Sequence, residues 1–370
     1  MATMTTKQAI KLPVVDISSV DQESVAAELI DAAATQGFVY IKNLGRDIPS
    51  SVVDHAFDLS RKFFSSPIEE KETCKITEDV SLYGTNVEKQ VEADASHLQN
   101  RGWSGMHTET LDAKNQRVGD FKEAFNIAEF LNGHPQQPLP PSLAPHEAEI
   151  STFFTYCHEL CLRVLTLFAM GLKIPSSAGG STFFSTRHEA ARGPSGSTLR
   201  LLHYPSIPET ADYQPDVDIR AGAHSDYGSV TLLFQRPGQP GLEIRTPAGT
   251  WAPVAVIPEG TESDAGPPIL VNIGDLFSYW TNGLLKSTVH RVIFPNEGRV
   301  GGEDRYSMAF FCHPLNDTLL EPVPSAMIKA RVVSDRHGEE EKVLTAQEHL
   351  LGRLRATYLS LNFDKPDEEI

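Results

Sequence analysis

The second half of the chain constrains its fold most, because it is a succession of short β-rich segments separated by glycine, proline and asparagine. Each segment has roughly the four to eight residues usual for a strand, and the residues between them favour turns. Many short strands in sequence are typical of a sandwich or jelly roll. The candidate strands cover residues 198–204, 220–223, 230–234, 242–245, 269–272, 287–294 and 306–312. We therefore predict a mainly β core with helices packed around it.

The first half of the chain has helical periodicity instead. Residues 21–36 are an example, because their apolar side chains share one stripe and Gly37 follows where a terminating glycine is favoured. Ser66, followed by proline, predicts a helix start with Ser66 as the N-cap. Thr345 and Glu348 have the spacing of a capping box before a last helix. We also predict helices over 51–64, 146–170 and 345–361, a strand over 38–43, and a long loop with short strands over 74–120.

The organisation of the chain is expected to be one catalytic β core with helical packing, and not two independent domains. Its 370 residues, 40% of them hydrophobic, are enough to bury a sizeable core. The expected regions are a helical and strand region over 1–130, a long helix and connection over 131–195, a jelly-roll catalytic core over 196–320, and a helical region over 321–370.

Charge and hydropathy exclude two classes of partner. The net charge of −17 opposes binding to a phosphate backbone, so we expect no nucleic-acid partner. A membrane span needs about 18 or more consecutive apolar residues, and the sequence has no such run, so we expect no membrane partner. Residues 1–13 lack the apolar region of a secretory signal and predict a frayed end, although their Thr-rich start weakly resembles a transit peptide.

The four cysteines predict a reducing compartment, which indicates a cytoplasmic protein. They form no C-x-x-C pair and no disulfide-like framework. Cys157 and Cys161 lie four residues apart in a predicted helix and share a face. They could form a metal or redox pair, but two small apolar residues in a core helix are the simpler interpretation.

A candidate metal site lies in the β-rich half. His224 and Asp226 are two residues apart, so on an extended strand both side chains point to the same side. His290, in a later strand-like run, could supply a third ligand. Two histidines and one carboxylate on one face of a metal form the facial triad of iron(II) oxygenases. An H-x-D pair is weak evidence in a chain with 13 histidines, because a hydrogen-bonded strand pair would look the same.

Arg305 and Ser307 make the metal interpretation more specific. They lie on one face of a predicted strand after His290. An arginine fork binds a carboxylate through two parallel hydrogen bonds, and a neighbouring hydroxyl adds another. The pair therefore suits the distal carboxylate of a dicarboxylic cosubstrate whose other end chelates the metal.

Together these features resemble the 2-oxoglutarate-dependent iron(II) oxygenases of the isopenicillin N synthase-like superfamily, over nearly the whole chain. The residues that carry the resemblance are 12–16 (LPVVD), 37–45 (GFVYIKNLG), 63–71 (FFSSPIEEK), 120–125 (DFKEAF), 200–205 (RLLHYP), 272–275 (NIGD), 280–283 (WTNG) and 287–292 (STVHRV). Leu44 departs from the histidine usual in plant members, at a position remote from the metal motif. The segments around Arg200 and Phe311 look closest to fungal members, including thymine 7-hydroxylase-like and secondary-metabolism enzymes.

The resemblance implies a double-stranded β-helix, or jelly roll, as the core. It implies His224, Asp226 and His290 as both the catalytic residues and the ligands of Fe(II), and a reaction that consumes O2. It implies that Arg305 and Ser307 bind the distal carboxylate of 2-oxoglutarate. The enzyme would hydroxylate a small organic metabolite and convert 2-oxoglutarate to succinate and carbon dioxide, with desaturation or ring formation as other outcomes.

Other site residues are open between two interpretations. Tyr204 matches a position whose hydroxyl often contacts the cosubstrate, but a core tyrosine would look the same. Arg200, on the same strand face, could bind a carbonyl or carboxylate of the substrate or form a partly exposed ion pair. Phe311 could stack on a planar substrate or fill the core. Tyr227, next to Asp226, is a further substrate candidate whose simpler role is structural.

Two rival functions differ in class from this one. An oxidase of the isopenicillin N synthase type would keep the iron and use no 2-oxoglutarate. A zinc-bound or non-catalytic jelly-roll protein would keep only the fold. A nucleic-acid demethylase would suit the chemistry but not the net charge of −17. We expect a monomer by default, and a small molecule as the substrate.

Overall fold

The computed structural model describes residues 9–76, 101–131, 133–206, 214, 217–294, 303–330 and 343–358. Most of residues 1–13 and the end of the helix predicted over 345–361 lie outside these ranges. The helices are α1 (Gln22–Thr35), α2 (Ser50–Phe64), α3 (Ile68–Glu72), α4 (Glu147–Gly171), α5 (Asp275–Trp280), α6 (Ala326–Lys329) and α7 (Ala346–Tyr358). Short 3-10 turns occupy Ala144–His146, Ser176–Ala178, Gly180–Thr182, Ser185–Arg187 and Ala190–Arg192.

Two facing sheets form the core, as predicted for a jelly roll. The larger has eight strands in the order β1-β2-β12-β9-β14-β7-β4-β3. The smaller has four, in the order β11-β10-β13-β8. In chain order the strands of the two sheets are β1 (Val14–Val15), β2 (Phe38–Ile41), β3 (Gly102–Ser104), β4 (Glu123–Ala128), β7 (Thr198–Tyr204), β8 (Ala221–His224), β9 (Val230–Gln235), β10 (Leu242–Arg245), β11 (Trp251–Pro253), β12 (Ile269–Ile273), β13 (His290–Val292) and β14 (Arg305–Cys312). A separate pair, β5 (Phe130–Leu131) and β6 (His134–Pro135), completes them.

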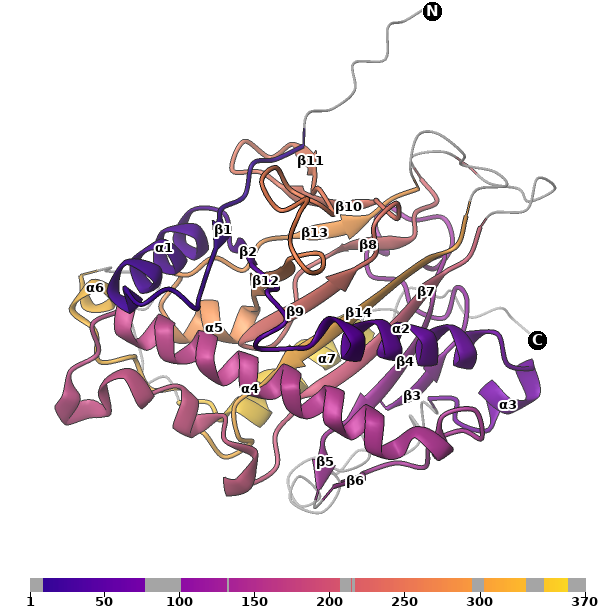
Figure 1. The fold of residues 1–370 in the computed structure, drawn as a ribbon, viewed down its shortest axis with the longest axis horizontal. Coiled ribbons are helices and arrows are strands. Elements are labelled where there is room, and N and C mark those ends of the chain that lie inside the picture. Colours follow the sequence, from indigo (N-terminus) through magenta and orange to yellow (C-terminus); the bar gives the residue numbers. More distant parts are fainter. Residues whose placement is uncertain are drawn as a thin grey trace, which may run out of the picture.

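Alternation along the strands divides the apolar residues into two cores. On β9, Val230, Leu232 and Phe234 belong to the core between the large sheet and the helices. Leu233, one residue out of phase, belongs to the core between the two sheets. Helices α1, α2 and α4 cover the outer face of the large sheet (Figure 1). The inner face is therefore left to meet the small sheet, and the predicted site residues lie there.

Helix α4 is the longest helix among the described residues, and its apolar side chains form part of the hydrophobic core. Together with the preceding turn, Ala144–Gly171 is long and apolar enough to cross a membrane by length and composition alone. Its buried side chains, including Cys157 and Cys161 with no exposed surface, pack against the large sheet and α1. This is how a buried helix of a globular core behaves. All four cysteines are free, so the core interpretation of Cys157 and Cys161 agrees with the structure.

Several helix ends are set by the capping residues that the sequence predicts. Asp21 caps α1, and Gly37 follows it with φ of 71°. A side chain at Gly37 would also meet the Lys286 carbonyl, which lies 2.3 Å from the position of a Cβ atom. The Thr345–Glu348 capping box is confirmed, with its two reciprocal hydrogen bonds at 2.8 and 3.1 Å.

The N-cap predicted at Ser66 is wrong. Helix α3 begins at Ile68 with Pro67 at its N-cap. The N–H and hydroxyl of Ser66 both donate to the Phe63 carbonyl instead, so Ser66 completes the end of α2. The strand predicted over 287–294 is also too long, because only His290–Val292 is extended and paired.

Strand β4 was not predicted. All six of its residues are buried, Glu123 and Asn126 included, so it has no polar and apolar alternation to detect. It pairs with β7 and extends the large sheet on the side where Arg200 lies.

Candidate metal centre and cavity

Three of the predicted residues come together between the two sheets. His224 ends β8 and His290 begins β13, and the two residues are directly paired in the small sheet. Asp226 lies just beyond β8. Its Oδ1 atom is 3.9 Å from Nε2 of His224 and 3.7 Å from Nε2 of His290. Three donor atoms so close together could hold one metal ion.

The backbone fixes which nitrogen of each histidine faces the centre. Nδ1 of His224 lies 2.7 Å from the Gly222 carbonyl, and Nδ1 of His290 lies 3.1 Å from the Thr288 carbonyl. A carbonyl only accepts, so each Nδ1 carries the hydrogen and each Nε2 keeps a lone pair. Both lone pairs are therefore available to a metal beside Asp226.

The segment before His290 is held by the end of α1. The Thr288 hydroxyl donates to the Gln36 carbonyl at 2.8 Å, and the Lys286 N–H donates to the Ala33 carbonyl at 3.0 Å. Phe38 packs edge-on against the His290 ring, with the ring centres 5.6 Å apart. These contacts orient His290 although β13 itself has only three residues.

The carboxylate of Asp226 is oriented by two donors to its other oxygen. Thr231 and Asn272 each donate to Oδ2 at 2.7 Å, which leaves Oδ1 directed at the histidines. In the sequence, Asn272 belongs to the motif at 272–275 without a predicted role, and nothing marks Thr231 as a site residue. Strand alternation could have indicated Thr231, because it lies two residues before Leu233 on β9 and so faces the space between the two sheets.

The electrostatics of the three groups suit a divalent cation. Burial lowers the pKa of His224 well below its ordinary value, and the neighbouring His290 lowers it further. Burial alone would raise the pKa of Asp226, but the two histidines and the hydrogen bonds from Asn272 and Thr231 lower it. The site thus combines neutral imidazole with an ionised carboxylate, which is the protonation state a metal needs.

Arg305 is a buried cation next to this centre. It is 1% exposed and hydrogen-bonds neutral groups: the hydroxyl of Ser307 at 3.1 Å, the Gln235 side-chain carbonyl at 3.2 Å and the Gln239 backbone carbonyl at 3.2 Å. Its guanidinium lies 4.9 Å from the ring centre of Tyr204. Within the described ranges no carboxylate pairs with it, and burial lowers the pKa of Arg305. A buried cation without a counterion is a site for an anion.

One cavity connects these groups. Its wall includes His224, Asp226, His290, Tyr204, Arg305, Ser307, Arg200 and Phe311. The shared face predicted for Arg305 and Ser307 agrees with this cavity wall, and Phe311 on the same strand lines it too. An adjoining cavity shares Arg200, His224 and Phe311 with it and reaches Tyr227 and helix α7. The two cavities give room for a cosubstrate next to Arg305 and a second molecule toward α7.

Arg200 fits both of its interpretations. It forms an ion pair with Glu109 at 3.2 Å and donates to Asn126 at 2.7 Å, while its side chain is 12% exposed and lines both cavities. Lys122 contacts the same carboxylate at 3.0 Å. Burial alone would raise the pKa of Glu109, but Arg200 and Lys122 bring it to about 2. Glu109 was missed in sequence, and Lys122 was given no role there.

Helix α7 closes the outer cavity. Gln347, Leu350 and Leu354 form part of its wall. Arg353 pairs with Asp275 at 2.7 Å and lies 5.5 Å from the ring centre of Tyr227. The sequence predicted this helix but not its contact with the site.

A jelly roll with two histidines on paired strands, and a carboxylate just beyond one of them, defines the class of non-haem metal-dependent oxygenases. Comparison with known proteins agrees. Residues 12–147 match the N-terminal region of the non-haem dioxygenases of morphine synthesis, and residues 195–314 match the 2OG-Fe(II) oxygenase superfamily. A UPF0676 protein of Schizosaccharomyces pombe is 36% identical, over 95% of this chain and 94% of its own. The 2-oxoglutarate-dependent dioxygenase htyE of Aspergillus rugulosus is 29% identical, over 92% of this chain and 96% of its own.

The thymine 7-hydroxylase of Neurospora crassa, solved with α-ketoglutarate and 5-formyluracil, superposes with a TM-score of 0.71 at 28% identity. The match covers 95% of this chain and all of that one. The chain belongs to the 2OG-Fe(II) oxygenase superfamily. It is a 2-oxoglutarate-dependent dioxygenase, with Fe(II), 2-oxoglutarate and O2 as the cofactors and cosubstrates of its family.

Proposed function

We propose that His224, Asp226 and His290 bind the Fe(II) of this dioxygenase, and that Arg305 and Ser307 bind the distal carboxylate of 2-oxoglutarate. The observation that carries this assignment is the buried guanidinium of Arg305, which shares one cavity with the three metal donors and has only neutral partners within the described ranges. A dicarboxylate between them would meet the arginine with one end and the metal with the other. Tyr204, whose ring lies against the guanidinium, shapes this part of the cavity.

The roles of the side chains follow from their contacts. Bound Fe(II) supplies the activation of O2 coupled to decarboxylation of 2-oxoglutarate to succinate. The backbone carbonyls behind His224 and His290 keep both Nε2 atoms directed at the metal. Thr231 and Asn272 hold Asp226 in place, and their hydrogen bonds add to the effect of the two histidines in lowering its pKa. We also propose residues 196–320 as the catalytic core, because all the proposed metal and cosubstrate ligands lie in it, and regions 1–130, 131–195 and 321–370 as the parts that support it.

The substrate is a small organic molecule that binds between Arg200, Phe311 and Tyr227, toward α7. Arg200 would donate to a carbonyl or carboxylate, and Phe311, 5.8 Å from that guanidinium, would stack on a planar ring. A relative in this family, the Neurospora crassa thymine 7-hydroxylase, has been solved with thymine in complex. Hydroxylation at carbon is the default outcome.

The test of this function is oxygen-dependent formation of succinate from 2-oxoglutarate, stimulated by a member of a library of planar metabolites. His224→Ala should abolish turnover. His107→Ala, which changes an exposed histidine bonded to the Gly119 carbonyl, is the matched control and should keep it. Equal turnover by His224→Ala and wild type would refute the metal assignment. A protein that turns over substrate without 2-oxoglutarate would instead be an oxidase of the isopenicillin N synthase type.

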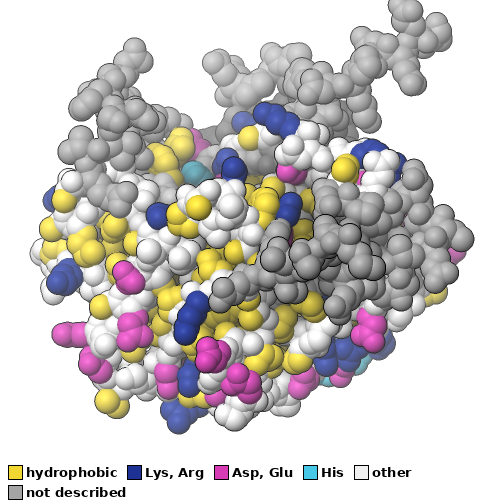
Figure 2. All heavy atoms as spheres, turned by 90° about the horizontal axis from the view of Figure 1, so that it is seen from above, with side chains coloured by type: hydrophobic (Ala, Val, Ile, Leu, Met, Phe, Trp, Pro, Cys, Tyr) yellow, Lys and Arg dark blue, Asp and Glu magenta, His cyan; other side chains and the backbone are white. Residues whose placement is uncertain are grey.

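The charge of the protein surface opposes a nucleic-acid partner and leaves a small molecule as the expected substrate. On the face in Figure 2, Lys and Arg side chains are scattered among apolar and acidic ones, and the chain carries a net charge of −17. We therefore propose that the protein has no nucleic-acid partner. We also propose a cytoplasmic location, in keeping with its four free cysteines, and a monomer as the default state. Mass measurement in solution and fractionation of the source cells test the last two statements.

A further inference from the structure

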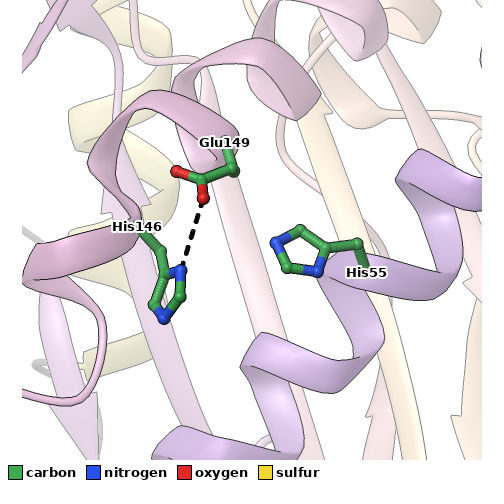
Figure 3. Close-up of side chains that lie close together, drawn as sticks. All are labelled: His55, His146 and Glu149. Atoms are coloured by element: carbon green, nitrogen blue, oxygen red, sulfur yellow. Dashed lines mark hydrogen bonds and ion pairs between the residues drawn. The ribbon is translucent and has the colours of Figure 1, made fainter.

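A second group of metal-type donors lies on the outer side of the molecule, between α2 and α4. It consists of His55 on α2, and of His146 and Glu149 at the start of α4 (Figure 3). One donor atom from each residue lies within 4.8 Å of the other two. We propose that His55, His146 and Glu149 form a binding site for a divalent transition metal, for which Zn²⁺ is the probe.

The geometry is close to that of a metal site before the ion binds. Nδ1 of His146 is 3.4 Å from Oε1 of Glu149, and the rings of His55 and His146 are 6.1 Å apart at an angle of 72°. Bonds of about 2.0 Å at tetrahedral angles put zinc ligands about 3.3 Å from one another. The widest pair must therefore close by at most roughly 1.5 Å, which half-exposed side chains on helices can do by small rotations.

The donor set favours transition metals over Mg²⁺ or Ca²⁺. Two imidazoles suit zinc, nickel and copper, and the carboxylate adds charge. Glu149 lies at the surface, where a carboxylate is ionised at neutral pH. Water would complete the coordination, because the cluster is at the surface, with His146 25% and Glu149 47% exposed. Within the described ranges, His55 has no hydrogen bond or ion pair, so it is available as a ligand.

An apolar cavity lies next to the cluster. His55 and Glu149 line it together with Ala56, Leu59 and Leu201. Leu199 and Leu201 of β7 form one wall of this cavity. Arg200 lies between them in sequence and points from the other face of β7 into the catalytic cavity. The apolar wall limits access of water from one side, which strengthens metal–ligand interactions. A metal ion here would join α2 to α4 over the strand that supports the catalytic cavity.

Lys62 competes with the metal. Its Nζ atom lies 2.9 Å from Nε2 of His146 and donates to it, so Nδ1 carries the hydrogen while no metal is bound. When a metal ion binds Nδ1 of His146, the hydrogen of the neutral ring lies on Nε2. Nε2 can then no longer accept a hydrogen bond, so the ammonium of Lys62 must move away. The site therefore predicts that Lys62→Met, which removes the ammonium and keeps the apolar stem, binds Zn²⁺ several-fold more tightly than wild type.

Equilibrium dialysis of the full chain against micromolar Zn²⁺ tests the proposal. Wild type should bind two equivalents, one at the catalytic triad and one here. His55→Ala should bind one. His134→Ala is the matched control and should keep two, because His134 and Glu147 form a neighbouring surface pair at 2.9 Å to which no third donor is added among the residues that the structure describes. His224→Ala should lose only the catalytic equivalent, which separates this site from the proposed function.

Localisation and stability give independent readouts. A crystal soaked in Zn²⁺ should show an anomalous peak between His55 and Glu149, and Zn²⁺ should raise the melting temperature of His224→Ala but not of His224→Ala combined with His55→Ala. One equivalent in wild type, a second equivalent that survives in His55→Ala, or no peak between α2 and α4 would overturn the proposal. An unchanged Zn²⁺ affinity in Lys62→Met would also contradict the coordination through His146.

Discussion

Thr231 and Asn272 lie directly opposite each other on β9 and β12, and both donate to the same oxygen of Asp226. The pair therefore acts as a two-point clamp on a carboxylate that is not itself in a strand. Its effect is to leave a single oxygen of Asp226 for the metal. The clamp also lowers the pKa of Asp226 against the effect of burial.

The first prediction concerns this clamp. Asn272→Ala should weaken Fe(II) binding by about 10- to 100-fold, the usual effect of removing a partner that orients a metal ligand. Thr231→Val should act in the same direction, and Thr231→Ser, which keeps the hydroxyl, should bind as wild type does. Anaerobic Fe(II) titration measures the three affinities. Equal affinity in Asn272→Ala and wild type would mean that the clamp does not position Asp226.

The second prediction concerns Arg305. Arg305→Lys should raise KM for 2-oxoglutarate by about tenfold or more, because lysine cannot donate two parallel hydrogen bonds to a carboxylate. Fe(II) affinity should change little. Arg291→Lys is the matched control, since Arg291 pairs with Glu243 at 2.7 Å and neither residue lines the cavity that holds Arg305. An unchanged KM in Arg305→Lys would place the cosubstrate elsewhere.

The third prediction follows from Glu109, buried between Arg200 and Lys122. Its pKa falls from 4.5 to about 2, so its charged form stabilises the folded state above about pH 4.5 and this contribution is lost as the pH falls toward 2. The shift corresponds to roughly 3 kcal/mol at neutral pH. Glu109→Gln should therefore be destabilised at pH 7, and its urea unfolding curve should approach that of wild type on acidification. A gap between the curves that stays constant down to acid pH contradicts this account.

The fourth prediction concerns the contact between α7 and the site. The Arg353–Asp275 ion pair is partly exposed, so Arg353→Ala should change the free energy of unfolding by less than about 1 kcal/mol. Backbone hydrogen exchange in α7 should nevertheless increase, because the helix loses its anchor beside Tyr227. Arg355→Ala, at an exposed position of the same helix, is the control and should leave exchange unchanged. Equal protection in both variants would rule out the anchoring role.

Much of the site could be predicted from sequence because it is carried by strand alternation. The spacing of Arg305 and Ser307 on β14 defines their shared face before any fold is known. The predicted proximity of His224 and Asp226 agrees with the structure, but the strand assumed for both ends at His224, and the bonds from Thr231 and Asn272 hold Asp226 instead. The resemblance then supplied the jelly roll, in which His290 pairs with His224 on the neighbouring strand of the small sheet. Helix ends with local signals, such as Asp21 and the Thr345–Glu348 box, were equally accessible.

The parts that could not be predicted depend on contacts between distant segments. Glu109 lies in an irregular stretch without periodicity, and only packing brings it against Arg200. β13 is shorter than predicted because the hydroxyls of Ser287 and Thr288 bond to Asp275 and to the end of α1 instead of continuing a strand. The site between α2 and α4 has no sequence signature either, since its donors come from two helices far apart in the chain.

The most direct test of the central assignment is an anaerobic absorption titration of the Fe(II)-loaded protein with 2-oxoglutarate. Wild type should develop a weak charge-transfer band that saturates with one equivalent of 2-oxoglutarate. Arg305→Met should need much more 2-oxoglutarate, and His290→Ala should develop no band. A wild-type protein that holds Fe(II) yet shows no band at saturating 2-oxoglutarate, or a band unchanged in both variants, would contradict the proposed roles of the triad and Arg305.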